Sequence, residues 1–170
     1  MTTQRIGGTG TGTPVPARFG ARLAGVAVAM PAGTPLEFIV GAAIFPLPLA
    51  PARVAGLMQL RGQPLVVLDA SAVPAGGSVL CRRDVLVVGL PAQAAALLVD
   101  GPPQPLPEGS WRLADGPLPD CVFAQALRAG QTAAPTAGPA TGRDRSGDPC
   151  AAASWYEIDP GRLFEALARN

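Results

Sequence analysis

Proline and glycine interrupt this chain so often that few long helices fit into it. The 170 residues include 20 prolines and 21 glycines, whereas charged residues make up only 15%. Proline cannot continue a helix, and glycine favours turns. The segments between these breaks are short and apolar, and the charged residues common on surface helices are scarce. The chain is therefore expected to be mainly β, with many short strands joined by turns.

Apolar alternation places the expected strands. Residues 18–30 alternate small and apolar side chains around Gly25, which predicts two strands. Residues 85–99 form the longest apolar run, and a break at Pro91 turns this run into a buried hairpin. Taken alone, the pattern supports either a barrel or a sandwich. Further strands are expected at residues 36–40, 63–69 and 154–158, with weaker ones at 104–106 and 111–113.

A C-terminal helix is expected after the last strand. Asp159 is a suitable N-cap, and Pro160 fits the first helical position. On the preceding strand, Trp155 is expected to anchor this segment in the core rather than line a ligand site. The apolar face of the helix consists of Leu163, Phe164 and Leu167.

A second, shorter helix is expected at residues 51–58. Pro51 suits a first helical turn, and three apolar side chains then follow at helical spacing. These side chains are Val54, Leu57 and Met58.

Composition divides the chain into one domain and two polar segments. Residues 1–16 are rich in glycine and threonine and are expected to form a flexible leader. Residues 129–153 are rich in alanine, glycine and proline and are expected to be a disordered insertion. The folded domain is therefore expected to span residues 17–169.

The residue inventory argues against most catalytic and metal chemistry. The chain has no histidine, so the usual general base and the commonest metal ligand are missing. Its cysteines, at positions 81, 121 and 150, are widely spaced and form no zinc-binding pair. We therefore expect no catalytic residue, no metal site and no cofactor.

Charge and hydropathy argue against nucleic-acid and membrane partners. The formal net charge is +1, and all basic residues are arginines. No long-range field therefore attracts nucleic acid, and the pair Arg82 and Arg83 is too small for such a site. The longest apolar run is too short to span a membrane, and the first residues do not resemble a signal peptide. A cytoplasmic location is expected.

The segment 56–62 and the residues around it resemble the signature of the CheW-like family, the coupling proteins of bacterial chemosensory arrays. Residues 56–62 read Gly-Leu-Met-Gln-Leu-Arg-Gly, and an aspartate, Asp69, closes the next strand. Gln59 stands where the family has asparagine, and the stretch 70–84 is short. Further matching segments are residues 44–48, 97–101, 158–160 and 163–164.

This resemblance implies both a fold and a function. It implies two SH3-like five-stranded β-barrel lobes that share a core. It further implies an adaptor without enzymatic activity, which binds the cytoplasmic tip of a chemoreceptor and the regulatory domain of a CheA-type histidine kinase. A terminal Trp-x-Glu-Ile-Asp pattern is similar to the variant found in pilus-based twitching motility. The partner-binding residues that it implies are Leu36, Glu37, Gln59, Leu60, Arg61 and Gly62.

Several of these side chains also have a purely structural interpretation. Arg61 either grips a partner or pairs within its own domain, and Glu37 either pairs with Arg61 or is simply solvated. Leu36 starts an alternating strand that either packs in the core or lines a receptor groove. Asp69 and Asp100 each end a strand, where a carboxylate accepts backbone N–H bonds in the following turn.

Two other functions remain as alternatives at this stage. One is a small carboxylate-dependent enzyme that uses Glu37, Asp69 or Asp100. The other is a small-barrel nucleic-acid-binding module, which needs an arginine-rich face with exposed aromatic side chains.

Overall fold

A computed structural model describes residues 18–71, 80–90, 93–106, 112–114, 116–128 and 154–169. The expected leader at residues 1–16 and the expected insertion at residues 129–153 lie outside the described residues. Within the described part, no helix is long and apolar enough to cross a membrane.

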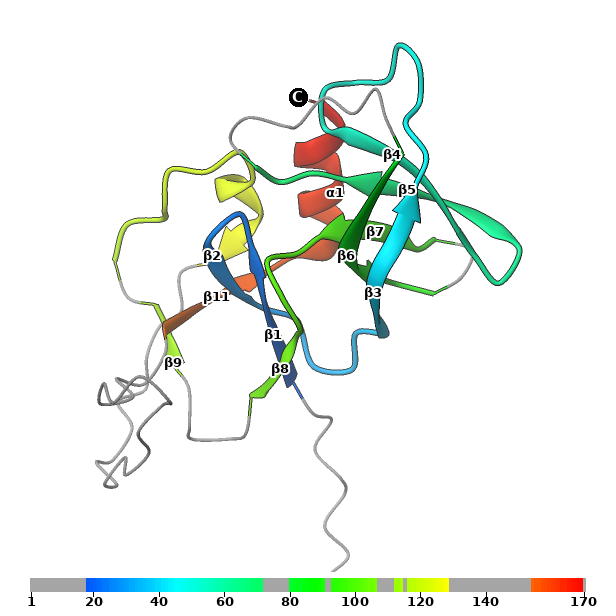
Figure 1. The fold of residues 1–170 in the computed structure, drawn as a ribbon. Helices are drawn as coiled ribbons and strands as arrows, with labels where there is room; N and C mark the ends of the chain where they lie inside the picture. The colour runs from blue at the N-terminus through cyan, green and yellow to red at the C-terminus, as the bar shows by residue number, and fades with distance from the viewer. Residues whose placement is uncertain are drawn as a thin grey trace, which may run out of the picture.

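The described chain is mainly β, as expected, and forms two sheets and one α-helix (Figure 1). The strands expected from the sequence are all present, and the C-terminal helix begins at Pro160 as expected. The elements are β1 (Arg18–Leu23), β2 (Val26–Ala29), β3 (Leu36–Ile44), β4 (Val54–Leu60), β5 (Gln63–Leu68), β6 (Cys81–Val88), β7 (Ala95–Leu98), β8 (Gln104–Leu106), β9 (Arg112–Leu113), a 3-10 turn (Ala124–Ala126), β10 (Leu127–Arg128), β11 (Ser154–Ile158) and α1 (Pro160–Arg169).

The central part of the chain forms a five-stranded sheet with the order β3-β6-β7-β5-β4. Its two end strands meet again at a bridge between Phe45, just after β3, and Leu57 of β4. The two backbones exchange hydrogen bonds of 2.8 Å there, so the sheet closes into a barrel. Inside, small and medium apolar side chains alternate with outward-facing ones, as a closed sheet requires. The buried side chains of this barrel include Ile44, Met58, Leu65, Val67, Val85 and Val87.

The first and last parts of the chain together form the second sheet, with the order β10-β11-β2-β1-β8. Strand β11 runs parallel to β2 on one side and to β9 on the other. The chain therefore starts in this lobe, builds the five-stranded barrel, and returns to complete the lobe where it began. Strands that are far apart in sequence hold each lobe together.

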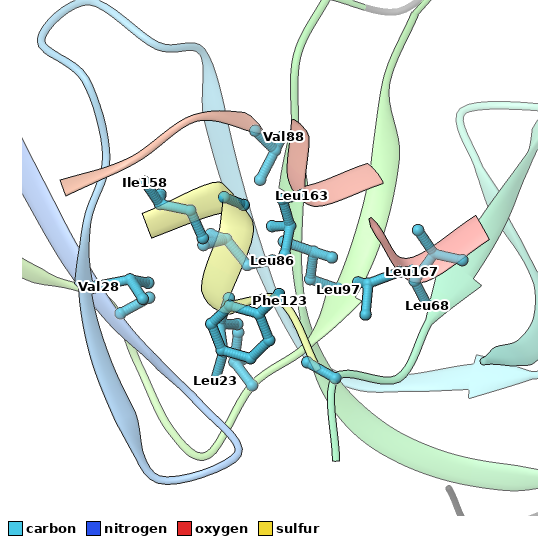
Figure 2. Packing of buried hydrophobic residues seen from close by; sticks show 14 of the residues in the cluster. Leu23, Val28, Leu68, Leu86, Val88, Leu97, Phe123, Ile158, Leu163 and Leu167 are labelled. Atoms are coloured by element: carbon cyan, nitrogen blue, oxygen red, sulfur yellow. The ribbon is translucent and has the colours of Figure 1, made fainter. Parts of the chain in front are cut away.

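Helix α1 lies between the two lobes and fills their common core (Figure 1). Leu163 and Leu167 are fully buried on its inner face. Figure 2 shows them against buried side chains from both sheets. Each fully buried leucine stabilises the fold by about 1.5–3 kcal/mol through its removal from water. The surrounding side chains are Leu68, Leu86 and Leu97 from the barrel, and Leu23, Val28, Phe123 and Ile158 from the second lobe.

The prediction of a helix at residues 51–58 is wrong, because strand β4 starts at Val54. Met58 is buried while its neighbour Leu57 faces outward, which is strand alternation and not a helical face. A close contact between two backbones explains the strand. A Cβ on Gly56 would lie 2.3 Å from the carbonyl oxygen of Phe45, so only glycine lets β4 approach β3 here.

Asp159 caps α1 as the sequence predicts. Its Oδ1 accepts the backbone N–H of Arg162 at 3.1 Å, and its Oδ2 lies 3.2 Å from Nη2 of Arg128. The hydrogen bond from Arg162 lowers the pKa of the Asp159 carboxyl; slight desolvation opposes this shift, and the charge of Arg128 supports it. The folded state therefore favours the ionised form of this carboxyl.

We expect Asp159→Ala to lower the free energy of unfolding by about 1 kcal/mol at neutral pH, because the helix loses its N-cap. Asp159→Asn keeps a capping oxygen and should cost less. A lowered folded-state pKa stabilises the fold above the unfolded value of about 3.9, and this contribution fades as the pH falls through the folded value. Urea unfolding at pH 7 and pH 3 should therefore show a smaller gap between wild type and Asp159→Asn at pH 3 than at pH 7. A gap that stays constant would contradict the assignment.

A second prediction concerns Gly20, which lies in β1 directly under the ring of Trp155. A Cβ at this position would stand 2.5 Å from the six-membered ring of Trp155, which is itself only 3% exposed. We expect Gly20→Ala to destabilise the protein by about 1–3 kcal/mol, because the buried ring has to move. Thermal unfolding measures the effect. In a Trp155→Leu background the same substitution should cost far less, and Gly161→Ala, where the new methyl group meets only an ordinary contact of 3.4 Å, serves as control.

Candidate functional site

The β4–β5 hairpin presents Arg61 at its tip. Leu60 pairs with Gln63, which leaves Arg61 and Gly62 as a two-residue turn. Both have positive φ angles, 49° and 81°, as a tight hairpin of this kind requires. Glycine adopts this conformation freely, whereas an arginine there costs about 1 kcal/mol or more. The turn fixes the direction in which the backbone of Arg61 leaves the barrel.

Arg61 pairs with Glu37 across the barrel surface, which confirms one of the two interpretations of Glu37. Nη2 of Arg61 lies 3.0 Å from Oε1 of Glu37. The side chains are 74% and 38% exposed, so water screens the pair. An ion pair of this kind orients the guanidinium more than it stabilises the fold.

An open pocket of about 210 Å³ lies beside this ion pair at one end of the barrel. Its walls are mostly apolar, and among the described residues that line it Glu37 is the one carboxylate. Leu65 and Val87 form its floor and belong to the barrel core. The pocket is thus the mouth of the barrel, with one ion pair on its rim. The other lining residues are Pro35, Leu36, Leu60, Gln63, Gly89, Leu90 and Ala94.

Four of the six side chains singled out from the sequence surround this pocket, namely Leu36, Glu37, Leu60 and Arg61. Gln59 is exposed and precedes Leu60 on β4, so its side chain leaves the opposite face of the strand. Gly62 supplies the second residue of the turn and does not line the pocket.

The sequence analysis missed the far wall of the pocket. Val87, Leu90 and Ala94 come from the β6–β7 hairpin, which was identified only as buried. Glu37 is paired with Val87 in the ladder between β3 and β6, and this register brings the two walls together. Residues 85–88 of β6 are all buried, so their pattern does not show which of them face the barrel interior, and only the strand pairing places Val87 next to Glu37.

The two carboxylates at strand ends have structural partners. Oδ1 of Asp69 accepts two hydrogen bonds from Ser71, one from its backbone N–H at 2.9 Å and one from its hydroxyl. This confirms the role in the following turn that was expected for Asp69. Oδ2 of Asp100 accepts the backbone N–H of Gly25 at 2.7 Å, so it holds the β1–β2 turn rather than its own. Among the described residues, no three potential metal ligands cluster together.

Comparisons with known proteins identify the fold. No family model matches the chain, and no curated protein matches it in sequence. Among solved structures, the chain is similar to the scaffolding protein TtCheW from Thermoanaerobacter tengcongensis. The TM-score is 0.53 at 17% sequence identity, and the match covers 89% of this chain and 93% of that one.

The weakness of the ion pair can be tested directly. We expect Arg61→Ala and Glu37→Ala to change the free energy of unfolding only slightly, and the coupling in a double-mutant cycle to stay below about 1 kcal/mol. The physical reason is the exposure of both side chains. Urea unfolding of the two single variants and the double variant measures the coupling. A coupling of several kcal/mol would show that the pair holds the barrel together.

These observations agree on the architecture. Two β lobes share one core, as the resemblance implied. The protein has a CheW-like fold.

Proposed function

We propose that this protein is a non-enzymatic adaptor that joins the cytoplasmic tip of a chemoreceptor to the regulatory domain of a CheA-type histidine kinase. Its pathway is chemotaxis or pilus-based motility, and its location is the cytoplasm. The fold shared with a CheW scaffolding protein supports this proposal. The arrangement at the β4–β5 hairpin supports it independently of that likeness.

The observation that carries the proposal is Arg61, a long cation held out from a rigid barrel beside an apolar pocket. Its planar guanidinium suits a carboxylate or a group of carbonyl oxygens on a partner. The pocket beside it has room for an apolar side chain of the same partner. A receptor segment that offers both groups would be held in one orientation.

Each of the six proposed partner-binding residues has a role in this scheme. Leu36 and Leu60 supply apolar surface at the pocket rim, and Glu37 orients Arg61 before the partner arrives. Gly62 permits the tight turn that presents Arg61. Gln59 leaves β4 on the outer face of the barrel, where it extends the contact beyond the pocket.

The coupling itself would be geometric. Both lobes pack on one core, so surfaces on the two lobes keep a fixed relation. A receptor bound to one surface and a kinase bound to another would then be held at a defined distance and angle. A shift in the receptor could bias the activity of the kinase without any chemistry in this chain.

The pocket favours binding over catalysis. Glu37 is already paired with Arg61, and no second carboxylate lines the part of the pocket that the structure describes. An enzyme of the glycosidase type needs two such groups facing one substrate. The structural partners of Asp69 and Asp100 likewise leave these side chains with a role in turns.

We expect Arg61→Glu to weaken receptor binding by about ten-fold or more, because charge reversal removes the proposed anchor and leaves two carboxylates together. Binding of the purified protein to receptor tip fragments, and separately to the kinase regulatory domain, measures the effect. Arg61→Ala should weaken receptor binding less.

Arg169→Glu is the matched control, because Arg169 is equally exposed and also forms an ion pair, on α1. It should leave receptor binding unchanged. Equal binding by wild type and Arg61→Glu, with both proteins folded, would remove Arg61 from the receptor site.

A further inference from the structure

Strands β3 and β4 are the two ends of the five-stranded sheet, and they meet at one point only. Within the described residues this point is the bridge between Phe45 and Leu57. Beyond the bridge the strands separate, so the start of β3 and the tip of the β4–β5 hairpin lie apart (Figure 1). The pocket lies in this opening, since its walls include Glu37 on one side and Leu60 and Arg61 on the other. The barrel is therefore open along one side at this end.

The outer edge of β3 directs unpaired backbone groups into this opening. The N–H of Gly89 donates to the carbonyl of Pro35 at 3.1 Å, which fixes the residues of β3 that bond to β6. Bonded and non-bonded pairs alternate in an antiparallel ladder. The alternate residues Leu36 and Phe38 therefore point their N–H and C=O groups away from β6. No described strand pairs with this side of β3 at these positions.

A β-bulge sets the length of this free edge. The register between β3 and β6 shifts there, so that Val40 and Gly41 both lie opposite Asp84. The N–H of Gly41 donates to Oδ1 of Asp84 at 2.8 Å, and Nη1 of Arg82 donates to the carbonyl of Gly41 at 3.1 Å. Both backbone groups of Gly41 are thus already bonded. The free edge therefore covers residues 36–40.

This stretch of β3 lacks the usual protection of an exposed strand edge. Such edges commonly carry prolines or several charged side chains, which discourage a further strand from pairing. Here Leu36 and Phe38 are apolar and half-buried, and Val40 is 72% exposed. The one charged residue is Glu37, and its pair with Arg61 at 3.0 Å neutralises it. An apolar edge with free donors and acceptors is a template for another strand.

We propose that the partner segment at this site is an extended strand of about five residues that adds to the outer edge of β3. Its backbone lies about 4.8 Å away and bonds to the backbones of Leu36 and Phe38. Side chains of a strand alternate between two faces, so every second one points into the mouth of the barrel. One of these side chains is apolar and enters the pocket. The next one on the same face is a carboxylate, which meets Arg61.

The free backbone groups select a strand over a helix and over a second copy of this chain. A helix uses its own N–H and C=O groups internally and cannot bond to those of Leu36 and Phe38. A β3 strand from a second copy would bring Glu37, which is already bound to its own Arg61. The proposal rests on the proposed function for its site and partner, and it adds the conformation of the bound segment.

A cyclic β-hairpin peptide tests the proposal with the full-length protein, because cyclisation holds its strands extended before binding. One strand carries a leucine and, two residues along, an aspartate; the other strand carries threonines in their place. N-methylation of the outward amides of the leucine strand removes the donors that would bond to β3. The same change on the threonine strand is the matched control. In an NMR titration we expect the first change to weaken binding by at least about ten-fold, and the second to leave it unchanged.

Hydrogen exchange of individual amides locates the contact. The N–H groups of Leu36 and Phe38 should exchange quickly in the free protein and slowly in the complex. Those of Glu37 and Ile39 bond to β6 and should be protected in both states. Arg61→Glu should weaken hairpin binding, because the aspartate loses its partner.

Three results would overturn the proposal. One is equal binding by the two N-methylated hairpins, or no saturable binding of the unmodified one. Another is unchanged exchange at Leu36 and Phe38 in the complex. The third is a concentration-dependent dimer in which these amides are protected, because this would assign the edge to a second copy of the chain.

Receptor tip fragments separate this proposal from the proposed function. Fragments that bind through Arg61 but leave the exchange of Leu36 and Phe38 unchanged would support the adaptor function and refute the added strand. A hairpin that binds as expected, while the fragments neither bind nor compete with it, would refute the receptor as partner and support strand addition at this edge.

Discussion

The packing of α1 between two sheets is the constraint on which the rest of the structure depends. Leu163, Ala166 and Leu167 are fully buried against side chains from both lobes, so the lobes share this core in addition to the interior of the five-stranded barrel. Strand β11 leads directly into this helix and pairs with β2, which ties the last segment of the chain to the first. Separating the lobes would expose this whole apolar surface at about 25 cal/mol for each Å². The two lobes are therefore expected to move as one body, which any adaptor that transmits geometry requires.

A second constraint is the closure of the five-stranded barrel. It explains the pattern of glycine and arginine in residues 56–62, on which the family resemblance rests. Gly56 lets β4 approach Phe45, and the bridge at Leu57 closes the sheet. From that point β4 runs four residues to the turn at Arg61 and Gly62. The direction of the turn is thus set by backbone contacts at the start of the strand. A substitution at Gly56 would disturb the position of Arg61, although Gly56 contacts Phe45 and Arg61 pairs with Glu37. The three residues therefore act together. Gly56 allows the start of β4 to pack against Phe45, and Gly62 allows the turn that exposes Arg61 at the other end of the strand.

Local sequence patterns predicted the strands and the capped helix well, because alternation and capping act over a few residues. The strands at residues 18–30 and 154–158, and the N-cap at Asp159, needed no knowledge of distant segments. The helix expected at residues 51–58 failed for the opposite reason, since the contact between Gly56 and Phe45 comes from the closure of a sheet. The far wall of the pocket was missed in the same way, because only the pairing of Glu37 with Val87 places it there.

The exposed ion pair between Glu37 and Arg61 is compatible with the proposed role of Arg61 in binding a partner. A buried pair would resist opening, because each charge would have to be left without its partner in a medium of low dielectric. The present pair is screened by water, so opening it costs less than about 1 kcal/mol. An incoming carboxylate beside the pocket would be partly shielded from water by the apolar walls, and its bond to the guanidinium would gain strength for that reason. Under the proposed function, the pair would keep Arg61 in position while the site is free and would give way at little cost to a better acceptor.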